Sequence, residues 1–289
     1  MKTNRPSTTA EGMAIVRAIE SRKPESVRIC YDPIARRLVN PVSVFLSKLT
    51  FDSGIYDRFF APGGGAIEFI VARERYVDDF LRNGLREGLD QVVILGAGFD
   101  TRAYRIAGIE KVRVYEVDHP ATQEVKLKRL KKAIGPLPGH VTFVALDFNS
   151  RSLREGLAAA GFNENQRTLF IWQGVIMYLS PEAVDGTLAF IADHSGTGSS
   201  VIFDYFYIST LRDLTLKTAR RVTRMLGETL TFGLEEGQVG PFLEQRGFTS
   251  VHSADAAELH RLYFTGPNAV RLVKPGVAIA SAKTGTAQK

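Results

Sequence analysis

A pair of glycines directly after an apolar run is the clearest chemical feature of this sequence. The run QVVIL, residues 91–95, leads straight into the turn Gly96-Ala97-Gly98. Glycine has no Cβ, so the backbone of such a turn can approach a ligand closely, and the amide groups behind it can bind polar atoms. Asp118 ends the next apolar run, where its carboxylate could accept two ribose hydroxyls. Together these residues predict a nucleoside site.

Two nucleoside cofactors fit this arrangement, a nicotinamide dinucleotide and S-adenosylmethionine. The dinucleotide fingerprint has a third glycine, which allows the helix to pack closely beside the pyrophosphate. Thr101 occupies that position here, and the turn comes only after a long segment with helical patterns. Both observations favour S-adenosylmethionine, and the dinucleotide remains the alternative.

Two further candidate residues, Asp147 and Phe148, follow a third apolar run at residues 141–146. The carboxylate of Asp147 could accept a hydrogen bond from an exocyclic amine, and the ring of Phe148 could pack on an adenine. An aspartate at a strand end is also a common turn or cap residue. The adenine site and the simple turn therefore both remain open at this position.

The elements that must position these residues alternate in type after Asp90. Short runs rich in β-branched residues are separated by segments of helix length, which is typical of a doubly wound parallel sheet. The sequence thus predicts an α/β fold. The predicted strands are 92–95, 112–117, 141–146, 168–172, 200–205, 249–253 and 277–281.

The chain before this alternation predicts helices. Thr8 and Glu11 have the spacing of a capping box ahead of an apolar segment. Apolar residues recur at helical spacing from Ile67 to Leu81. We therefore expect residues 1–89 to form a helical cap.

The remaining residues, 90–289, are expected to form the cofactor-binding core. One stretch within it, residues 209–240, is charged, helical in pattern and too long for an ordinary connection in such a sheet. It predicts an inserted helical lid.

The composition excludes several classes of protein. Hydrophobic residues make up 44% of the chain and charged residues 24%, as in ordinary globular proteins. Cys30 is the only cysteine, and no cluster of Cys and His offers a set of metal ligands. The longest mostly apolar stretch, residues 170–179, is too short to cross a bilayer, and the first residues lack the apolar core of a secretory signal. These features predict a cytoplasmic protein with no membrane partner and no metal.

The positive charge of the chain suggests an anionic ligand. The formal net charge is +6, and five of the basic residues crowd into 126–132. Leu127 and Leu130 interrupt this run at helical spacing, and no aromatic residue nearby could stack on a base. The run therefore predicts a solvated helix face, and no nucleic-acid partner is expected.

Three motifs occur together at a specific spacing. They are ARERYVDD at 72–79, QVVILGAGFDTRAYR at 91–105 and YEVDHP at 115–120. Together they resemble the leucine carboxyl methyltransferase-like group of class I S-adenosylmethionine-dependent methyltransferases, and the similarity covers roughly residues 8–207. This resemblance implies a Rossmann-like sheet of seven strands, the last antiparallel, capped by N-terminal helices. It also implies S-adenosyl-L-methionine as the cofactor.

Carried over by position, the resemblance places Arg73 on the methionine carboxylate of the cofactor, residues 96–98 at the cofactor turn and Asp118 on the ribose. Asp147 and Phe148 would flank the adenine. The helical pattern is consistent with this role for Arg73. Arg73 lies on the flank of an apolar stripe, where its guanidinium group can reach inward to a carboxylate.

Other polar residues of the same helix are further candidates. Arg75 points elsewhere on the helical wheel and is the second candidate for the carboxylate. Glu74 and Asp78 fall on the apolar stripe, and buried acids need partners, so we expect one of them to hold the arginine or an amine of the cofactor.

Two candidate reaction-pocket residues follow the fourth predicted strand. Gln173 stands where the resembling group commonly has a glutamate near the cofactor, and it can form hydrogen bonds but supplies no charge. Tyr178 is a candidate for lining the reaction pocket, with burial in the core as the alternative.

The resulting hypothesis is methyl transfer from S-adenosylmethionine to an oxygen of a small acceptor, a carboxylate or an acidic hydroxyl. A carboxylate is ionised at neutral pH and needs no base. His119 is the one histidine at a predicted strand end in the catalytic half of the chain, and it looks like a turn residue. Three alternatives remain. They are a methyltransferase for phenol or polyketide hydroxyls that uses Tyr178, Asp204 or Tyr207, an NAD-dependent oxidoreductase, and a cofactor-binding protein without turnover.

Overall fold

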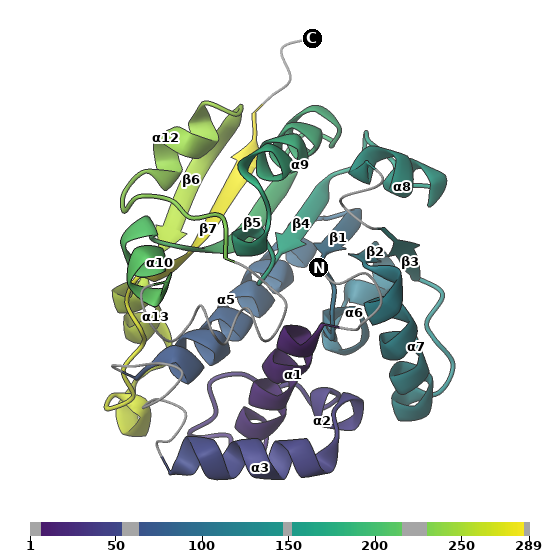
Figure 1. Cartoon of the computed structure of the whole chain (residues 1–289). Coiled ribbons are helices and arrows are strands. Elements are labelled where there is room, and N and C mark those ends of the chain that lie inside the picture. The colour runs from purple at the N-terminus through teal and green to yellow at the C-terminus, as the bar shows by residue number, and fades with distance from the viewer. Residues whose placement is uncertain (1–6, 54–63, 147–151, 216–229, 286–289) are drawn as a thin grey trace.

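The computed structural model describes residues 7–53, 64–146, 152–215 and 230–285 of the 289-residue chain (Figure 1). Within these residues, seven strands form one sheet in the order β3-β2-β1-β4-β5-β7-β6. Neighbouring strands from β3 to β5 are parallel, and β7 runs antiparallel to both β5 and β6. The predicted α/β fold, the seven strands and the antiparallel last strand are confirmed. The strands are β1 (Gln91–Leu95), β2 (Arg113–Asp118), β3 (Val141–Ala145), β4 (Thr168–Trp172), β5 (Ser200–Phe206), β6 (Phe248–Ala254) and β7 (Val277–Thr284).

The central strands are buried on both faces, which explains their continuous apolar sequence. Every residue of β1 is buried, and successive side chains point to opposite sides of the sheet. Val92 and Ile94 join one apolar cluster, whereas Val93 and Leu95 join another. The chain therefore needs a layer of helices on each face.

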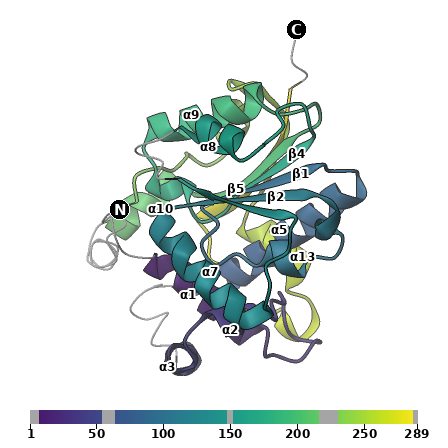
Figure 2. The ribbon, with the colours of Figure 1, turned by 90° about the vertical axis from the view of Figure 1, so that its right-hand side faces the viewer.

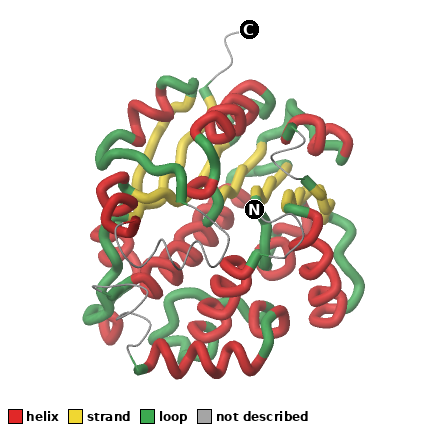
Figure 3. Tube along the Cα trace, viewed as in Figure 1, coloured by secondary structure: helices red, strands yellow, loops and turns green. Residues whose placement is uncertain are grey.

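Helices cover both faces of the sheet, as Figures 2 and 3 show. The apolar cluster of Val93 includes residues of α8 (Leu153–Ala159), α9 (Pro181–Asp193) and α12 (Val239–Glu244). The cluster of Val92 includes residues of α5 (Ala66–Arg86), α6 (Arg102–Arg105) and α13 (Ala256–Tyr263). Short 3₁₀ turns at Ile109–Lys111, Ile176–Tyr178 and Gly266–Asn268 complete the connections.

The N-terminal helices α1 (Thr8–Glu20), α2 (Ala35–Leu38) and α3 (Pro41–Asp52) pack together and against α7 (Pro120–Ile134). The helix predicted at the start of the chain is present, but its N-cap is Ser7, whose hydroxyl accepts the N–H of Ala10. The expected Thr8 cap was therefore one residue too late. The last helix of the segment predicted as the cap, α5, packs on the sheet, where Val77 shares a cluster with Val92. The division at residues 89 and 90 stays a prediction.

The basic run on α7 departs from its predicted environment at one position. Lys126 is 1% exposed, and its Nζ lies 2.8 Å from Oε2 of the buried Glu116 in β2. The prediction of a wholly solvated face was wrong here, because the carboxylate of Glu116 pairs with the lysine and offsets part of the cost of burying its charge.

The ends of the predicted lid lie beside the carboxyl ends of β4 and β5. Here α10 (Ile208–Thr215) follows β5, and a bridge joins Tyr207 to Leu234. The backbone N–H of Thr231 donates to the carbonyl oxygen of Met177 at 2.8 Å. The middle of the lid, residues 216–229, lies outside the described residues, so a helical lid stays a prediction. In the described part of the chain, no helix combines the length and apolar character needed to span a membrane.

Candidate functional site

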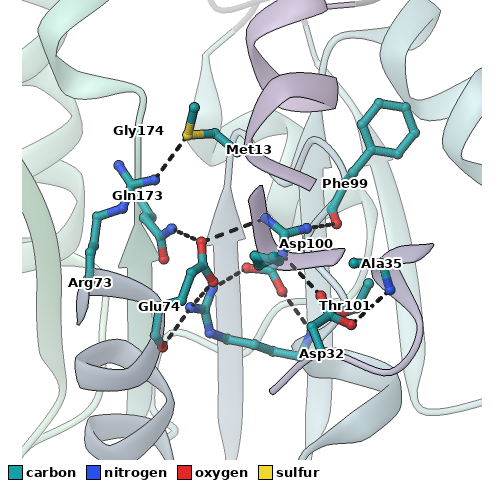
Figure 4. Close-up of polar contacts among 12 residues, drawn as sticks. Met13, Asp32, Ala35, Arg73, Glu74, Phe99, Asp100, Thr101, Gln173 and Gly174 are labelled. Atoms are coloured by element: carbon teal, nitrogen blue, oxygen red, sulfur yellow. Dashed lines mark hydrogen bonds and ion pairs between the residues drawn. The ribbon is translucent and has the colours of Figure 1, made fainter. Parts of the chain in front are cut away.

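The candidate site lies at the carboxyl edge of the parallel strands, where β1, β2, β4 and β5 end next to one another. The glycine turn follows β1, Gln173 and Gly174 follow β4, and Asp204 lies near the end of β5. A parallel sheet brings these strand ends together although they are far apart in the sequence. Figure 4 shows the polar side chains that meet here.

The glycine turn adopts a backbone that other residues disfavour. Gly96 and Gly98 have φ angles of 66° and 42°, in the left-handed region. A Cβ added to Gly98 would lie 3.0 Å from Cβ of Ala10 in α1, and one added to Gly96 would overlap the side chain of Val175. The surrounding packing therefore leaves little room for a side chain at either position, and α1 lies against the turn.

Gly98 and Asp118, paired by sequence spacing, are in direct contact. The N–H of Gly98 donates to one carboxylate oxygen of Asp118, and the N–H of His119 donates to the other at 2.6 Å. Burial raises the pKa of the Asp118 carboxyl, and these two hydrogen bonds oppose that rise. The predicted glycine turn and acid thus form one local unit.

Arg73 is buried and has one strong partner. Its Nη1 lies 2.5 Å from Oδ2 of Asp204, and its Nη2 contacts only Sδ of Met13, at 3.5 Å, among the described residues. Its Nε is buried and has no hydrogen-bond partner there. The Nε and Nη2 groups form the edge of a guanidinium that binds carboxylates with two hydrogen bonds. That edge of Arg73 is thus left without an oxygen acceptor in the described structure.

Asp204 is a site residue whose role sequence reasoning missed. One carboxylate oxygen pairs with Arg73, and the other accepts the N–H of Gly174 at 2.6 Å. The sequence suggested Asp204 only as a base for a hydroxyl acceptor. Its place in a buried strand was the available signal, because a buried carboxylate needs a charged partner.

Gln173 is held by Glu74 across the space between β4 and α5. The Nε2 group of Gln173 donates to Oε1 of Glu74 at 2.5 Å, and the other amide atom, Oε1, is buried without a described partner. Glu74 also lies 2.7 Å from Nη2 of Arg102. Burial opposes ionisation of Glu74, but the nearby guanidiniums outweigh it, so the pKa of its carboxyl lies below the usual value.

A buried ionic network surrounds Glu74. Asp78 accepts from Nε of Arg102 at 2.8 Å and from Nη1 of Arg105 at 2.5 Å. The two arginines behind the glycine turn therefore anchor that segment to α5. Asp78 and Glu74 hold these arginines and not Arg73. The buried network consists of Arg17, Asp32, Glu74, Asp78, Asp100, Arg102 and Arg105.

Arg17 connects this network to α1. Its Nε lies 2.9 Å from Oδ2 of Asp32, its Nη1 lies 3.5 Å from Oε1 of Glu74, and its Nη2 donates to the carbonyl of Phe99 at 2.5 Å. This role of Arg17 could not be predicted from local sequence, because Asp32, Glu74 and Phe99 lie 15 or more positions away along the chain.

The remaining predicted residues lie on the helix surface, in a turn after β4 or outside the described residues. Arg75, the second candidate for the carboxylate, pairs with Asp79 at 2.9 Å on the helix surface. Tyr178 is half-buried in a 3₁₀ turn after β4, and its place in the reaction pocket stays a prediction. Asp147 and Phe148 lie outside the described residues.

The comparisons with known proteins decide the family. The family model for leucine carboxyl methyltransferase matches residues 10–192. This chain belongs to the leucine carboxyl methyltransferase family. The resemblance predicted from the motifs is thereby confirmed, and the protein is a methyltransferase.

Relatives of this leucine carboxyl methyltransferase family member match it over nearly its whole length. A Bacillus subtilis protein, provisionally named the S-adenosyl-L-methionine-dependent methyltransferase YktD, is 31% identical over 92% of this chain and 93% of its own. A similarly named Mycobacteroides abscessus protein is 30% identical over 96% of this chain and 94% of its own. Among solved structures, human N-acetylserotonin methyltransferase in complex with S-adenosylmethionine is 13% identical, with a TM-score of 0.47, and the match covers 96% of this chain and 67% of that one.

Proposed function

We propose that this protein transfers a methyl group from S-adenosylmethionine to an oxygen of a small acceptor, either a carboxylate or an acidic hydroxyl. S-adenosyl-L-methionine is the cofactor, in agreement with the family and with the names of relatives that align over more than nine-tenths of the chain. Family membership disfavours the NAD-dependent alternative. The oxygen and the small acceptor are our proposal.

The observation that carries the proposal is a buried donor and a buried acceptor at one edge of the sheet. Arg73 presents an unpartnered Nε, and Gln173 presents an unpartnered Oε1, both within the described residues. A buried polar atom without a partner costs about 1–3 kcal/mol, so both atoms favour a ligand with complementary groups. The amino-acid tail of S-adenosylmethionine carries a carboxylate for the arginine and an ammonium for the amide oxygen. The residues present therefore fit this cofactor.

We assign the rest of the cofactor to the turn and the strand ends. The turn at residues 96–98 and the carboxylate of Asp118 would hold the ribose, and Asp147 and Phe148 would hold the adenine. The contact between Gly98 and Asp118 supports the first assignment, because it places a hydrogen-bonding carboxylate beside the turn.

The reaction requires the protein mainly to align the acceptor oxygen with the methyl group of the cofactor. The bound cofactor supplies a methyl group on a positively charged sulfur, which is already activated for transfer. The protein then has to orient the acceptor oxygen and exclude water, a role that we assign to Gln173, Tyr178 and the lid. An ionised carboxylate acceptor needs no base.

Two proposed bases for a neutral hydroxyl acceptor are poorly suited to that work. Asp204 uses one carboxylate oxygen on Arg73 and the other on Gly174. Burial raises the pKa of Tyr207 to about 12, so its phenolate would be scarce at neutral pH. These observations favour a carboxylate or an already acidic hydroxyl.

Titration calorimetry with S-adenosylhomocysteine and with NAD tests the cofactor. We expect the first to bind and the second not to bind; tight NAD binding with no response to S-adenosylhomocysteine would overturn the assignment. Turnover is then measured as S-adenosylhomocysteine release with a panel of carboxylic acids, acidic phenols and simple alcohols. Methylation of alcohols in preference to the acids would contradict the proposed acceptor class.

A further inference from the structure

Gln173 and Glu74 form an amide–carboxylate pair beneath the strand ends, and its geometry assigns a role to Glu74. We infer that Glu74 is a positioning residue, which holds the amide of Gln173 so that its carbonyl accepts a hydrogen bond from the ammonium group of the cofactor. The inference rests on the proposed function, since that ammonium belongs to S-adenosylmethionine.

The orientation of the amide follows from its partner. An amide side chain can be turned so that either its NH₂ group or its carbonyl faces a neighbour. The neighbour here is Oε1 of Glu74 at 2.5 Å from the Gln173 amide, and an ionised carboxylate can only accept hydrogen bonds. The reverse orientation would place two acceptor oxygens in contact. Glu74 therefore directs the Gln173 carbonyl away from itself.

Glu74 is itself rigidly held, so it can impose this orientation. Nη2 of Arg102 lies 2.7 Å from its Oε2, and Nη1 of Arg17 lies 3.5 Å from its Oε1. Its side chain is 2% exposed. These two guanidiniums keep the carboxylate charged and fixed in place. Figure 4 draws the polar contacts around Glu74 as dashed lines.

The oriented carbonyl is an acceptor that the described protein does not use. Oε1 of Gln173 is buried and without a partner, and Gly174, the next residue, lies close to the guanidinium of Arg73. A carboxylate on Arg73 and an ammonium on Gln173 would satisfy both side chains at once. The negative charge of Glu74, one hydrogen bond away, would strengthen the carbonyl as an acceptor for a cation. Glu74 thus supplies the charge that Gln173 lacks.

Exchange of the two side chains tests the inference. In Glu74→Gln two amides face each other, and the orientation of Gln173 is no longer imposed. In the double variant Glu74→Gln/Gln173→Glu the pair is again one amide and one carboxylate, with an acceptor oxygen available at position 173. Both variants lack the Glu74 charge and its ion pairs, so they differ only in the side chain at position 173.

The ligands are S-adenosylhomocysteine and 5′-methylthioadenosine, which has the same nucleoside but no amino-acid tail. We expect Glu74→Gln to weaken S-adenosylhomocysteine binding about tenfold, as for loss of one charge-assisted hydrogen bond, and to leave 5′-methylthioadenosine binding unchanged. The double variant should recover S-adenosylhomocysteine affinity. Glu68→Gln, on the same helix but paired with Arg271 near the surface, is the matched control and should change neither affinity.

Two results would overturn the inference. One is a parallel loss of affinity for both ligands in Glu74→Gln, which indicates a general structural effect. The other is a double variant that binds S-adenosylhomocysteine no better than Glu74→Gln. Failure of the wild-type protein to bind either ligand would instead contradict the proposed function, so the two failures are distinguishable. Thermal unfolding of each variant confirms that the protein measured is folded.

Discussion

The guanidinium of Arg73 in α5 and the carboxylate of Asp204 in β5 form a buried ion pair across 131 positions of the chain. The pair uses Nη1 of the arginine and leaves the Nε and Nη2 edge without an oxygen acceptor among the described residues. Asp204 therefore orients Arg73 and leaves the edge that suits a carboxylate available for a ligand.

Substitution of Arg73 should weaken cofactor binding selectively. Arg73→Ala should cost about 1.5–3 kcal/mol of S-adenosylhomocysteine binding, the scale of a lost charge-assisted contact. Arg73→Ala also leaves Asp204 without its partner, so Arg73→Lys serves as a second variant. The lysine keeps the positive charge but lacks the adjacent N–H groups of the guanidinium. Calorimetric titration measures both. Arg75→Lys, whose arginine pairs with Asp79 on the surface, should bind normally, and unchanged affinity in folded Arg73→Lys and Arg73→Ala would remove Arg73 from the site.

A side chain at Gly98 should disturb the contact between the turn and α1. Gly98→Ala combines left-handed backbone strain with a contact 3.0 Å from Ala10, so we expect a loss of S-adenosylhomocysteine affinity while the sheet persists in circular dichroism. Gly108→Ala is the matched control, because Gly108 has a φ of 89° but open space where a Cβ would lie. It should cost about 1 kcal/mol of stability and leave binding intact. Equal binding by the two variants would argue against the turn as the cofactor site.

Acid should destabilise the fold through the ionic network. Burial opposes ionisation of Asp100, but Arg102 and other nearby cations outweigh it and lower its pKa from 3.8 to about 2. A carboxylate with a lowered folded-state pKa stabilises the protein above its unfolded pKa, and this contribution is lost as the pH falls from about 4 to about 2. The shift corresponds to about 2 kcal/mol.

The variant Asp100→Asn should therefore lower the unfolding free energy at pH 7 by about 2 kcal/mol and flatten its decline in acid. Urea unfolding at several pH values measures this. The exposed carboxylate of Asp52 offers a control, because Asp52→Asn should change stability by no more than about 0.5 kcal/mol. An acid profile for Asp100→Asn that matches the wild type would show that Asp100 does not stabilise the fold.

Removal of Arg17 should destabilise the protein far more than removal of a surface arginine. Arg17→Leu leaves the buried carboxylates of Asp32 and Glu74 short of a cation, and breaking such a pair costs about 3–5 kcal/mol. Arg22→Leu, at an exposed position just after the same helix, should cost less than about 0.5 kcal/mol. Denaturant unfolding compares the two, and a loss below about 1 kcal/mol for Arg17→Leu would contradict the role assigned to the network.

Much of the secondary structure and the glycine turn of this protein could be predicted from local sequence. The strands follow from short runs of β-branched residues between helical segments. The helix at Pro181–Asp193 likewise begins at a local signal, a proline directly after Ser180, whose hydroxyl accepts the N–H of Ala183. The glycine turn and Asp118 could be paired by their spacing, because consecutive strands of a βαβ unit end at the same edge. Such features depend on residues that are close in the chain.

The partners of the buried charges could not be predicted in this way. The charge pattern predicted that Lys126 is exposed to solvent, but in the structure it is buried and pairs with the carboxylate of Glu116 on β2. The helical pattern predicted that Glu74 faces inward. It could not identify Gln173 as its hydrogen-bond partner, because Gln173 lies 99 positions away in the chain.

The sequence by itself thus determined the sheet, the turn and the family, because these rest on local periodicity and on motifs with constrained spacing. Only the tertiary structure decided that Asp204 holds Arg73, that Glu74 orients Gln173 and that α1 lies against the turn. The physical reason is that each of these contacts joins elements distant in the chain. Which charges meet then depends on how helices and strand ends pack in space, and buried charges are stable only where that packing provides a partner.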